Sequence, residues 1–295
     1  MTVARRDGGG WRMIAPEPVG DLPTLLPRLR AMAAGGAVAL GVDLPLGLPR
    51  AYAAAHASET DFPAFLRGLA DRPGFFEVCA TLEQLSPARP FYPARGLRGM
   101  TRAAHAAALG LGGPAGLSRL CDRATAERPA GAPLFWTLGA NQTGKAAITA
   151  WRDLLLPALA LPDAPALWPF AGDLLPLLAR HQIVVAETYP AEAMRHFGMR
   201  MGGSKRRQAD RAALAAPLAA AMAGLEAAPA PAMCAALADG FGADAAGEDR
   251  FDSVLGALCV LNVLARRRPD GLPDDPWLRR WEGFVLGQTA LPPAG

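Results

Sequence analysis

The chain has 295 residues, of which 51% are hydrophobic and 19% are charged, and its net charge at pH 7 is +3. This composition excludes general intrinsic disorder, and the length is sufficient to bury a core in one large domain or two small ones. The small positive charge excludes a histone-like electrostatic grip on nucleic acid, so a basic binding site must come from local clustering.

The N-terminal residues predict a hairpin followed by a helix. Residues 2–4 and 11–15 are typical of short strands, and the Gly-rich segment 7–10 between them is typical of a hairpin turn. Leucines recur at helical spacing over residues 22–34, with Asp21 as the expected N-cap and two glycines as the expected stop.

Two apolar runs predict strands that each end in a carboxylate. Residues 37–42 are followed by Asp43, and residues 182–186 are followed by Glu187. Continuous apolar runs of this length favour strands buried on both faces. Because open α/β sheets bind ligands at the carboxyl ends of their strands, both carboxylates are candidate site residues.

Helices are predicted for most of the remaining chain. Prolines interrupt residues 51–180, which predicts a mainly helical insertion of short elements, among them a helix from about 146 to 156 that ends at Pro157. The Ala-rich segment 211–240 is also expected to be helical. The last predicted helix covers residues 249–264 and has an apolar surface.

Two acidic residues at the start of the last helix complete a candidate metal site. Asp249 and Asp252 are three residues apart, so their side chains share one helix face. If this helix crosses the ends of the two strands, these carboxylates converge with Asp43 and Glu187. Repulsion among clustered carboxylates is relieved by a divalent cation, and oxygen ligands favour Mg²⁺ or Mn²⁺. The alternative for Asp249 is a helix N-cap or a partner of the helix dipole.

Cysteine usage and hydropathy exclude other classes of protein. The four cysteines are far apart and form no Cys-x-x-Cys, which argues against structural zinc and predicts buried, reduced thiols. No signal-peptide pattern and no run of about 18 apolar residues is present. We therefore expect a soluble, cytoplasmic protein.

Six segments of the chain carry a family resemblance. They are residues 41–49 (GVDLPLGLP), 89–93 (RPFYP), 135–145 (FWTLGANQTGK), 187–190 (ETYP), 204–208 (SKRRQ) and 249–257 (DRFDSVLGA). With the predicted order of elements, they resemble the RNase H-like superfamily, which includes Holliday-junction resolvases. More narrowly, the chain is similar to a bacterial family of predicted nucleases with this fold, and the similarity covers most of its length.

The resemblance implies an α/β fold in which an RNase H-like mixed sheet is flanked by helices. It implies a single domain over residues 1–295, with a core of about 1–50 and 180–268 and a mainly helical insertion over about 51–180. In this superfamily a leading Asp on the first strand bridges two metal ions. Here residues 2–6 match the second strand, so either the first strand is missing or the site lacks that ligand and its catalysis is impaired.

The activity implied by the resemblance is metal-dependent hydrolysis of phosphodiester bonds. Asp43 and Asp252 are then the best metal ligands, followed by Asp249, while Glu187 either binds a metal or orients water. Two ions about 3.5–4 Å apart would activate the water and stabilise the leaving oxygen.

A basic segment follows the second predicted strand and can supply phosphate contacts. Its members are Lys205, Arg206, Arg207 and Arg211. Positive side chains of this kind position a nucleic-acid backbone without reading its sequence. The alternative is a solvated helix start. The expected partners are nucleic acid or a small phosphate-containing ligand, and no membrane.

A second hypothesis concerns nucleotide or phosphate binding at the segment 139–145. Its sequence fits G-x-x-x-x-G-K, follows an apolar run and precedes a helix, so its amides can hold a phosphate together with Asn141, Gln142 and Lys145. Ala146 stands where a P-loop has a Ser or Thr for Mg²⁺.

A third hypothesis is a non-catalytic RNase H-like binding module. Six aromatic side chains can stack bases in such a module, although at this density aromatic residues more often form core. They are Phe75, Phe76, Phe91, Tyr92, Phe135 and Trp136.

Overall fold

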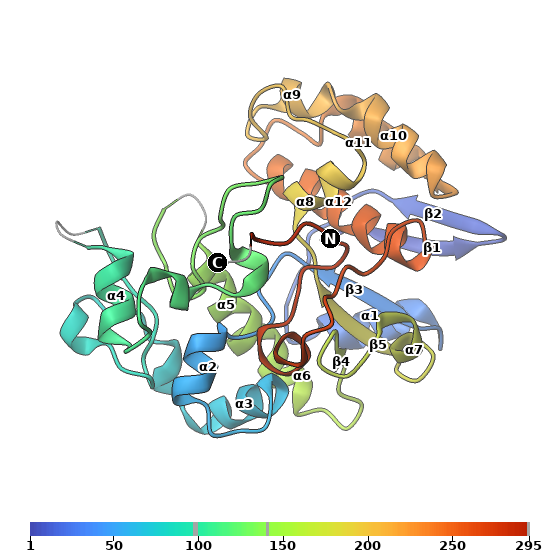
Figure 1. The fold of residues 1–295 in the computed structure, drawn as a ribbon. Helices are drawn as coiled ribbons and strands as arrows, with labels where there is room; N and C mark the ends of the chain where they lie inside the picture. The colour runs from blue at the N-terminus through green and yellow to red at the C-terminus, as the bar shows by residue number, and fades with distance from the viewer. Residues whose placement is uncertain (97–99, 140–141, 294–295) are drawn as a thin grey trace. The chain divides into compact units, whose positions relative to one another are not determined.

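The computed structural model describes residues 1–96, 100–139 and 142–293 (Figure 1). The chain divides into two compact units. Unit 1 consists of residues 1–21, 41–43 and 188–271. Unit 2 consists of residues 22–40, 44–187 and 272–295. Strands and helices occur in both, which confirms the predicted α/β class.

The sheet of unit 1 has three strands in the order β1-β2-β6. β1 (Val3–Asp7) and β2 (Gly10–Ile14) form the predicted antiparallel hairpin, and Arg6 stacks over the ring of its cross-strand partner Trp11 at 4.4 Å. β6 (Ala227–Pro229) is parallel to β2. This short strand interrupts the Ala-rich segment for which the sequence predicts only helix, because its main chain completes the sheet beside β2.

Five helices belong to unit 1, and the last of them forms much of its core. They are α8 (Pro190–His196), α9 (Gln208–Ala212), α10 (Ala215–Gly224), α11 (Pro231–Asp239) and α12 (Gly247–Leu264). α12 confirms the predicted last helix and packs against α8. Its apolar side chains, among them Phe251, Val254 and Leu258, are fully buried.

The sheet of unit 2 has the strand order β3-β5-β4. β3 (Val38–Val42) and β5 (Ile183–Glu187) confirm the two predicted strands, and β4 (Ala166–Leu167) is parallel to β5. β5 is buried along its whole length, as predicted, whereas β3 is buried only at Val42.

Short helices fill most of unit 2, as predicted for the insertion. The α-helices are α1 (Leu25–Ala33), α2 (Arg50–His56), α3 (Phe62–Gly68), α4 (Arg102–Ala108), α5 (Thr143–Ile148), α6 (Leu156–Leu159) and α7 (Leu174–Leu178). The π-helices are η6 (Thr149–Leu155) and η7 (Leu278–Glu282). The 3₁₀-helices are η1 (Leu69–Asp71), η2 (Pro73–Phe76), η3 (Leu82–Gln84), η4 (Pro114–Leu117) and η5 (Leu120–Asp122).

Two predicted helix ends differ from the structure. The N-cap of α1 is Thr24 and not Asp21, because Pro23 disfavours helical geometry in the residue before it and so delays the helix start. Pro157 does not end the helix before it. It lies in the first turn of α6, directly after π-helix η6, where a missing N–H is tolerated.

The predicted burial of the cysteines is confirmed for three of the four. All four cysteines are free thiols, and Cys79, Cys121 and Cys259 are buried, whereas Cys234 is exposed on α11. Within the part of the chain that the structure describes, no helix combines the length and the hydropathy that crossing a bilayer requires.

Candidate functional site

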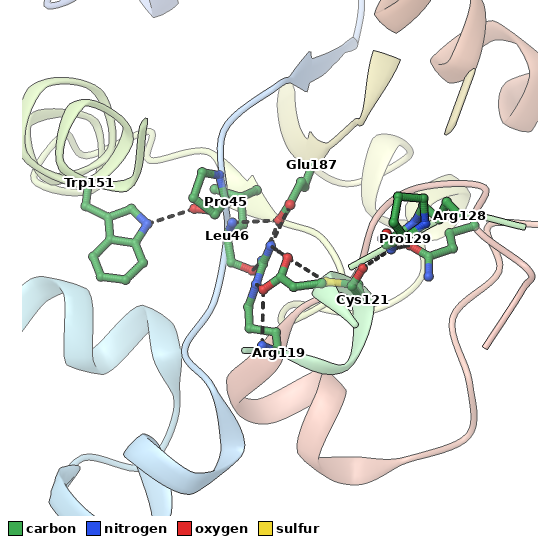
Figure 2. Close-up of polar contacts among 10 residues, drawn as sticks. Pro45, Leu46, Arg119, Cys121, Arg128, Pro129, Trp151 and Glu187 are labelled. Carbon is green, nitrogen blue, oxygen red and sulfur yellow. Dashed lines mark hydrogen bonds and ion pairs between the residues drawn. The ribbon is translucent and has the colours of Figure 1, made fainter. Parts of the chain in front are cut away.

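Glu187, the last residue of β5, lies in a buried ion pair with Arg119 (Figure 2). Arg119 Nη1 donates to Glu187 Oε2 at 2.6 Å, and Nη2 donates to Oε1 at 2.7 Å. Arg119 is 1% exposed and Glu187 is 6% exposed. A bidentate pair of this geometry is strong and holds both carboxylate oxygens in fixed directions.

Asp122 is the second carboxylate bound by the same guanidinium. Arg119 Nε donates to Asp122 Oδ2 at 3.0 Å, and Nη2 donates to Oδ1 at 2.9 Å. Burial raises the pKa of the Glu187 carboxyl, and the positive charge of Arg119 opposes that rise. Burial alone would lower the pKa of Arg119, but Asp122 and Glu187 raise it well above its usual value.

Glu187, Asp122 and Cys121 are also close enough to be considered as metal ligands. One potential ligand atom from each lies within 4.8 Å of the others. Arg119 already supplies a positive charge to both carboxylates, and burial raises the pKa of the Cys121 thiol and disfavours its thiolate. This group is therefore better explained as a structural anchor than as a metal centre.

The anchor holds the turn that follows β3. Leu46 N donates to Glu187 Oε2 at 2.7 Å, and Leu46 O accepts from Arg119 Nη1 at 3.0 Å (Figure 2). The adjacent carbonyl of Pro45 accepts from Trp151 Nε1 at 2.8 Å. Consecutive main-chain groups of this turn are thus bound by side chains that are distant in the sequence.

Asp252 lies on α12 in unit 1, and its two carboxylate oxygens differ in their hydrogen bonding. Oδ2 accepts from Lys205 Nζ at 2.5 Å, whereas Oδ1 is buried and has no hydrogen-bond partner among the described residues. Burial raises the pKa of Asp252, and Lys205 opposes the rise. Asp249 is exposed one turn earlier on the same helix face.

The end of β3 packs against α12 at residues that follow Asp252. A Cβ at Gly41 would lie 2.7 Å from Val260 Cγ2, and a Cβ at Gly256 would lie 3.3 Å from Thr188 Oγ1. Thr188 N donates to Val42 O at 2.8 Å. Gly41 and Thr188 therefore lie against α12 at Val260 and Gly256, which are eight and four residues after Asp252, and Asp43 is exposed two residues after Gly41.

The structure does not bring the predicted acidic residues into one tight cluster. Asp43, Asp249 and Asp252 belong to unit 1, whereas Glu187 belongs to unit 2. Within the described ranges, the three Asp residues do not form a group whose ligand atoms all lie within 4.8 Å of one another. Their separation is thus larger than that of a preformed ion cage.

The predicted basic segment contains one structural arginine. Arg211 is 1% exposed and donates to the main-chain carbonyls of Gly240 at 2.8 Å, Gly242 at 2.5 Å and Lys205. These bonds use the guanidinium within the protein, so Arg211 fixes the fold around Lys205.

Arg206 and Arg207 are the accessible members of the basic segment. Their side chains are 79% and 68% exposed. Arg206 Nε lies 4.0 Å from Glu248 Oε2, and Arg207 Nε donates to Asp210 Oδ2 at 2.5 Å. Exposed ion pairs of this kind are weak, which leaves both guanidinium groups able to turn toward an anion.

The segment 139–145 is described only in part. Asn141 lies outside the described residues, and Gln142 and Lys145 are exposed. α5 begins at Thr143, and Gly144 lies so close to Trp136 that a Cβ would be 2.8 Å from its carbonyl oxygen.

Five of the six aromatic candidates for base stacking are core residues. Phe75, Phe76, Phe91, Tyr92 and Phe135 are each at most 6% exposed. Phe91 packs edge-to-face on Phe135 at 5.3 Å, and this arrangement continues to the other buried rings. Trp136 is partly buried beside Tyr92, at 6.0 Å.

Arg119 and Asp122 are the site residues that sequence reasoning missed. Their signal is an Arg-x-x-Asp pair in the segment LSRLCD, where the neighbouring positions are largely apolar. Charged residues in such surroundings are buried only when they are paired.

No family model matches this chain, and no curated protein or solved structure matches it either.

Proposed function

We propose that the protein is a metal-dependent hydrolase of phosphodiester bonds with an RNase H-like fold. The observation that carries the proposal is the environment of Asp252. One oxygen is oriented by Lys205, and the other is buried without a partner in the described chain. An unsatisfied buried carboxylate oxygen is costly unless a cation or a proton donor joins it.

The residues around Asp252 fit Mg²⁺ or Mn²⁺. Asp249 adds a second carboxylate one turn away on α12, and Asp43 is exposed two residues after Gly41, which packs against the same helix at Val260. All three offer hard oxygen ligands, which both ions prefer. A bound ion would activate water and stabilise the charge that develops on the leaving oxygen.

The other polar groups have supporting roles in this proposal. Lys205 holds the Asp252 carboxylate in one rotamer. Arg206 and Arg207 bind phosphates of an extended substrate through their exposed guanidinium groups. Glu187 positions the turn after β3 through Leu46 and does not bind the metal.

The test is hydrolysis by purified protein with Mn²⁺ or Mg²⁺. Substrates are single-stranded, duplex and branched DNA, RNA, and bis(p-nitrophenyl) phosphate. We expect Asp43→Asn and Asp252→Asn to lower the rate at least about 100-fold, which corresponds to about 2.7 kcal/mol of transition-state stabilisation. Their thermal midpoints should stay near that of the parent, since neither change removes apolar packing.

Asp244→Asn is the matched control. Asp244 also lies in unit 1 near α12, but its side chain is exposed and pairs with Arg250. This variant should keep the parent rate. Absence of cleavage of every substrate, or cleavage that survives Asp252→Asn after repurification, would overturn the proposed function.

A further inference from the structure

An open cleft lies in unit 1, away from the acidic residues of α12. It has a volume of about 660 Å³, within the usual range of small-molecule sites. Its walls come from the segment after α8, from α10 and from the C-terminal end of α12. Asn262, on α12, lies ten residues beyond Asp252, or about 15 Å along the helix axis.

The floor of the cleft is apolar. Met199, Leu214 and Leu225 line it and are each at most 7% exposed. Phe197 and Ala221 are partly buried beside them. Such a surface favours the hydrocarbon part of a ligand, because its burial removes apolar area from water.

Asn262 contributes an unpartnered polar group to this apolar lining. It is 6% exposed, and its main-chain oxygen accepts from Arg267 N at 3.0 Å and Arg268 N at 3.2 Å. Its side-chain amide makes no hydrogen bond within residues 1–96, 100–139 and 142–293. The amide atoms of Asn262 are not among the fully buried unpartnered atoms of the described chain, so they are open to the cleft and can bond to a ligand there.

The polar rim of the cleft is positive. Arg200 and Arg267 line it and are exposed, and no lining residue in the described chain is acidic. Arg267 forms a loose pair with Glu226, at 3.8 Å, with both side chains more than 60% exposed. Arg200 has no ion-pair partner among the described residues. Two guanidinium groups next to an apolar floor match a ligand with one anionic end.

We propose that this cleft binds a small amphipathic anion. The apolar body of the ligand lies on Met199, Leu214 and Leu225, and its carboxylate or phosphate is held by Arg200 and Arg267. The Asn262 amide bonds to an oxygen of the same ligand. A small molecule fits better than a protein segment, because one amide and two cations line a single cleft of about 660 Å³.

The experiment is calorimetric titration of the full-length protein with four eight-carbon probes. Octanoate and octyl phosphate carry the two anionic groups, octanol is neutral, and octylammonium is cationic. We expect the two anions to bind at least about tenfold more tightly than octanol, because hydrogen bonds between a guanidinium and an anion are stronger than those to a neutral hydroxyl. Octylammonium should not bind. The anion that binds more tightly identifies the preferred headgroup.

Two variants form a matched pair on one segment. Arg267→Gln should weaken binding of the anions about tenfold, whereas Arg266→Gln removes the same charge from a residue that does not line the cleft and should leave binding unchanged. Ala220→Trp, at an exposed lining position on α10, should block binding without disturbing the core. Helical circular dichroism of each variant checks that it is folded.

Three results would overturn the proposal. The first is that neither anion binds at millimolar concentration. The second is that octanol binds as tightly as octanoate, which removes the role of Arg200 and Arg267. The third is equal affinity in the Arg266→Gln and Arg267→Gln variants, which places the binding elsewhere.

Discussion

Removal of Arg119 tests whether the buried anchor around Glu187 stabilises the protein. The Arg119 guanidinium donates five hydrogen bonds, two to Glu187, two to Asp122 and one to the carbonyl of Leu46. Arg119→Met keeps most of the volume but leaves the buried Glu187 and the partly buried Asp122 without a cation. Breaking a buried pair in this way costs about 3–5 kcal/mol, so we expect a loss of that size in the free energy of unfolding.

Glu187→Gln should cost less than the loss of Arg119. Asp122 still neutralises Arg119 in this variant, and Gln retains one oxygen as an acceptor, so we expect a loss of about 2–3 kcal/mol. The double variant Arg119→Met/Glu187→Gln should cost less than the two single losses added together, since the second change removes an unpaired charge that the first creates.

Urea denaturation followed by tryptophan fluorescence and circular dichroism measures these free energies. The buried Trp151 reports on unit 2. Arg152→Met is the control, because Arg152 is half exposed and its one ion pair within the described residues is with its neighbour Asp153, so its loss should stay within about 0.5 kcal/mol. A loss below about 1 kcal/mol for Arg119→Met, or additive losses in the double variant, would refute the anchor.

Three further predictions concern unit 2. Gly47→Ala should lower stability by at least about 2 kcal/mol in urea denaturation, since Gly47 has φ +130° and a Cβ would lie 2.0 Å from the carbonyl oxygen of Glu282; an unchanged midpoint would contradict this. Burial lowers the pKa of His105 from 6.5 to about 4. The stability that its neutral form contributes is therefore complete above pH 6.5 and lost as the pH falls toward 4, by about 3 kcal/mol in total. His105→Phe should flatten this part of the stability–pH curve, and an unaltered slope would count against the assignment. Trp151→Phe removes the bond to the Pro45 carbonyl and should cost about 1–3 kcal/mol in thermal unfolding, with no loss if the bond is absent in solution.

For the candidate site, the sequence predicts the positions of the acidic residues but not their surroundings. The sequence predicts that Asp43 follows a strand and that Asp252 lies on an apolar helix, and the structure has both residues in these positions. The environment of each carboxylate could not be predicted. Lys205, which orients Asp252, is 47 residues away, and no periodic pattern indicates which cation meets which acid.

The amino-acid sequence by itself determined the main elements of local secondary structure. The hairpin, β3, β5 and α12 follow from alternation, apolar runs and helical spacing, which act between residues a few positions apart. Only the tertiary structure decided that Glu187 bonds to Arg119 over 68 residues and to Leu46 over 141. Such pairings depend on how packed elements meet, because a buried charge takes whichever partner the fold brings within hydrogen-bond distance.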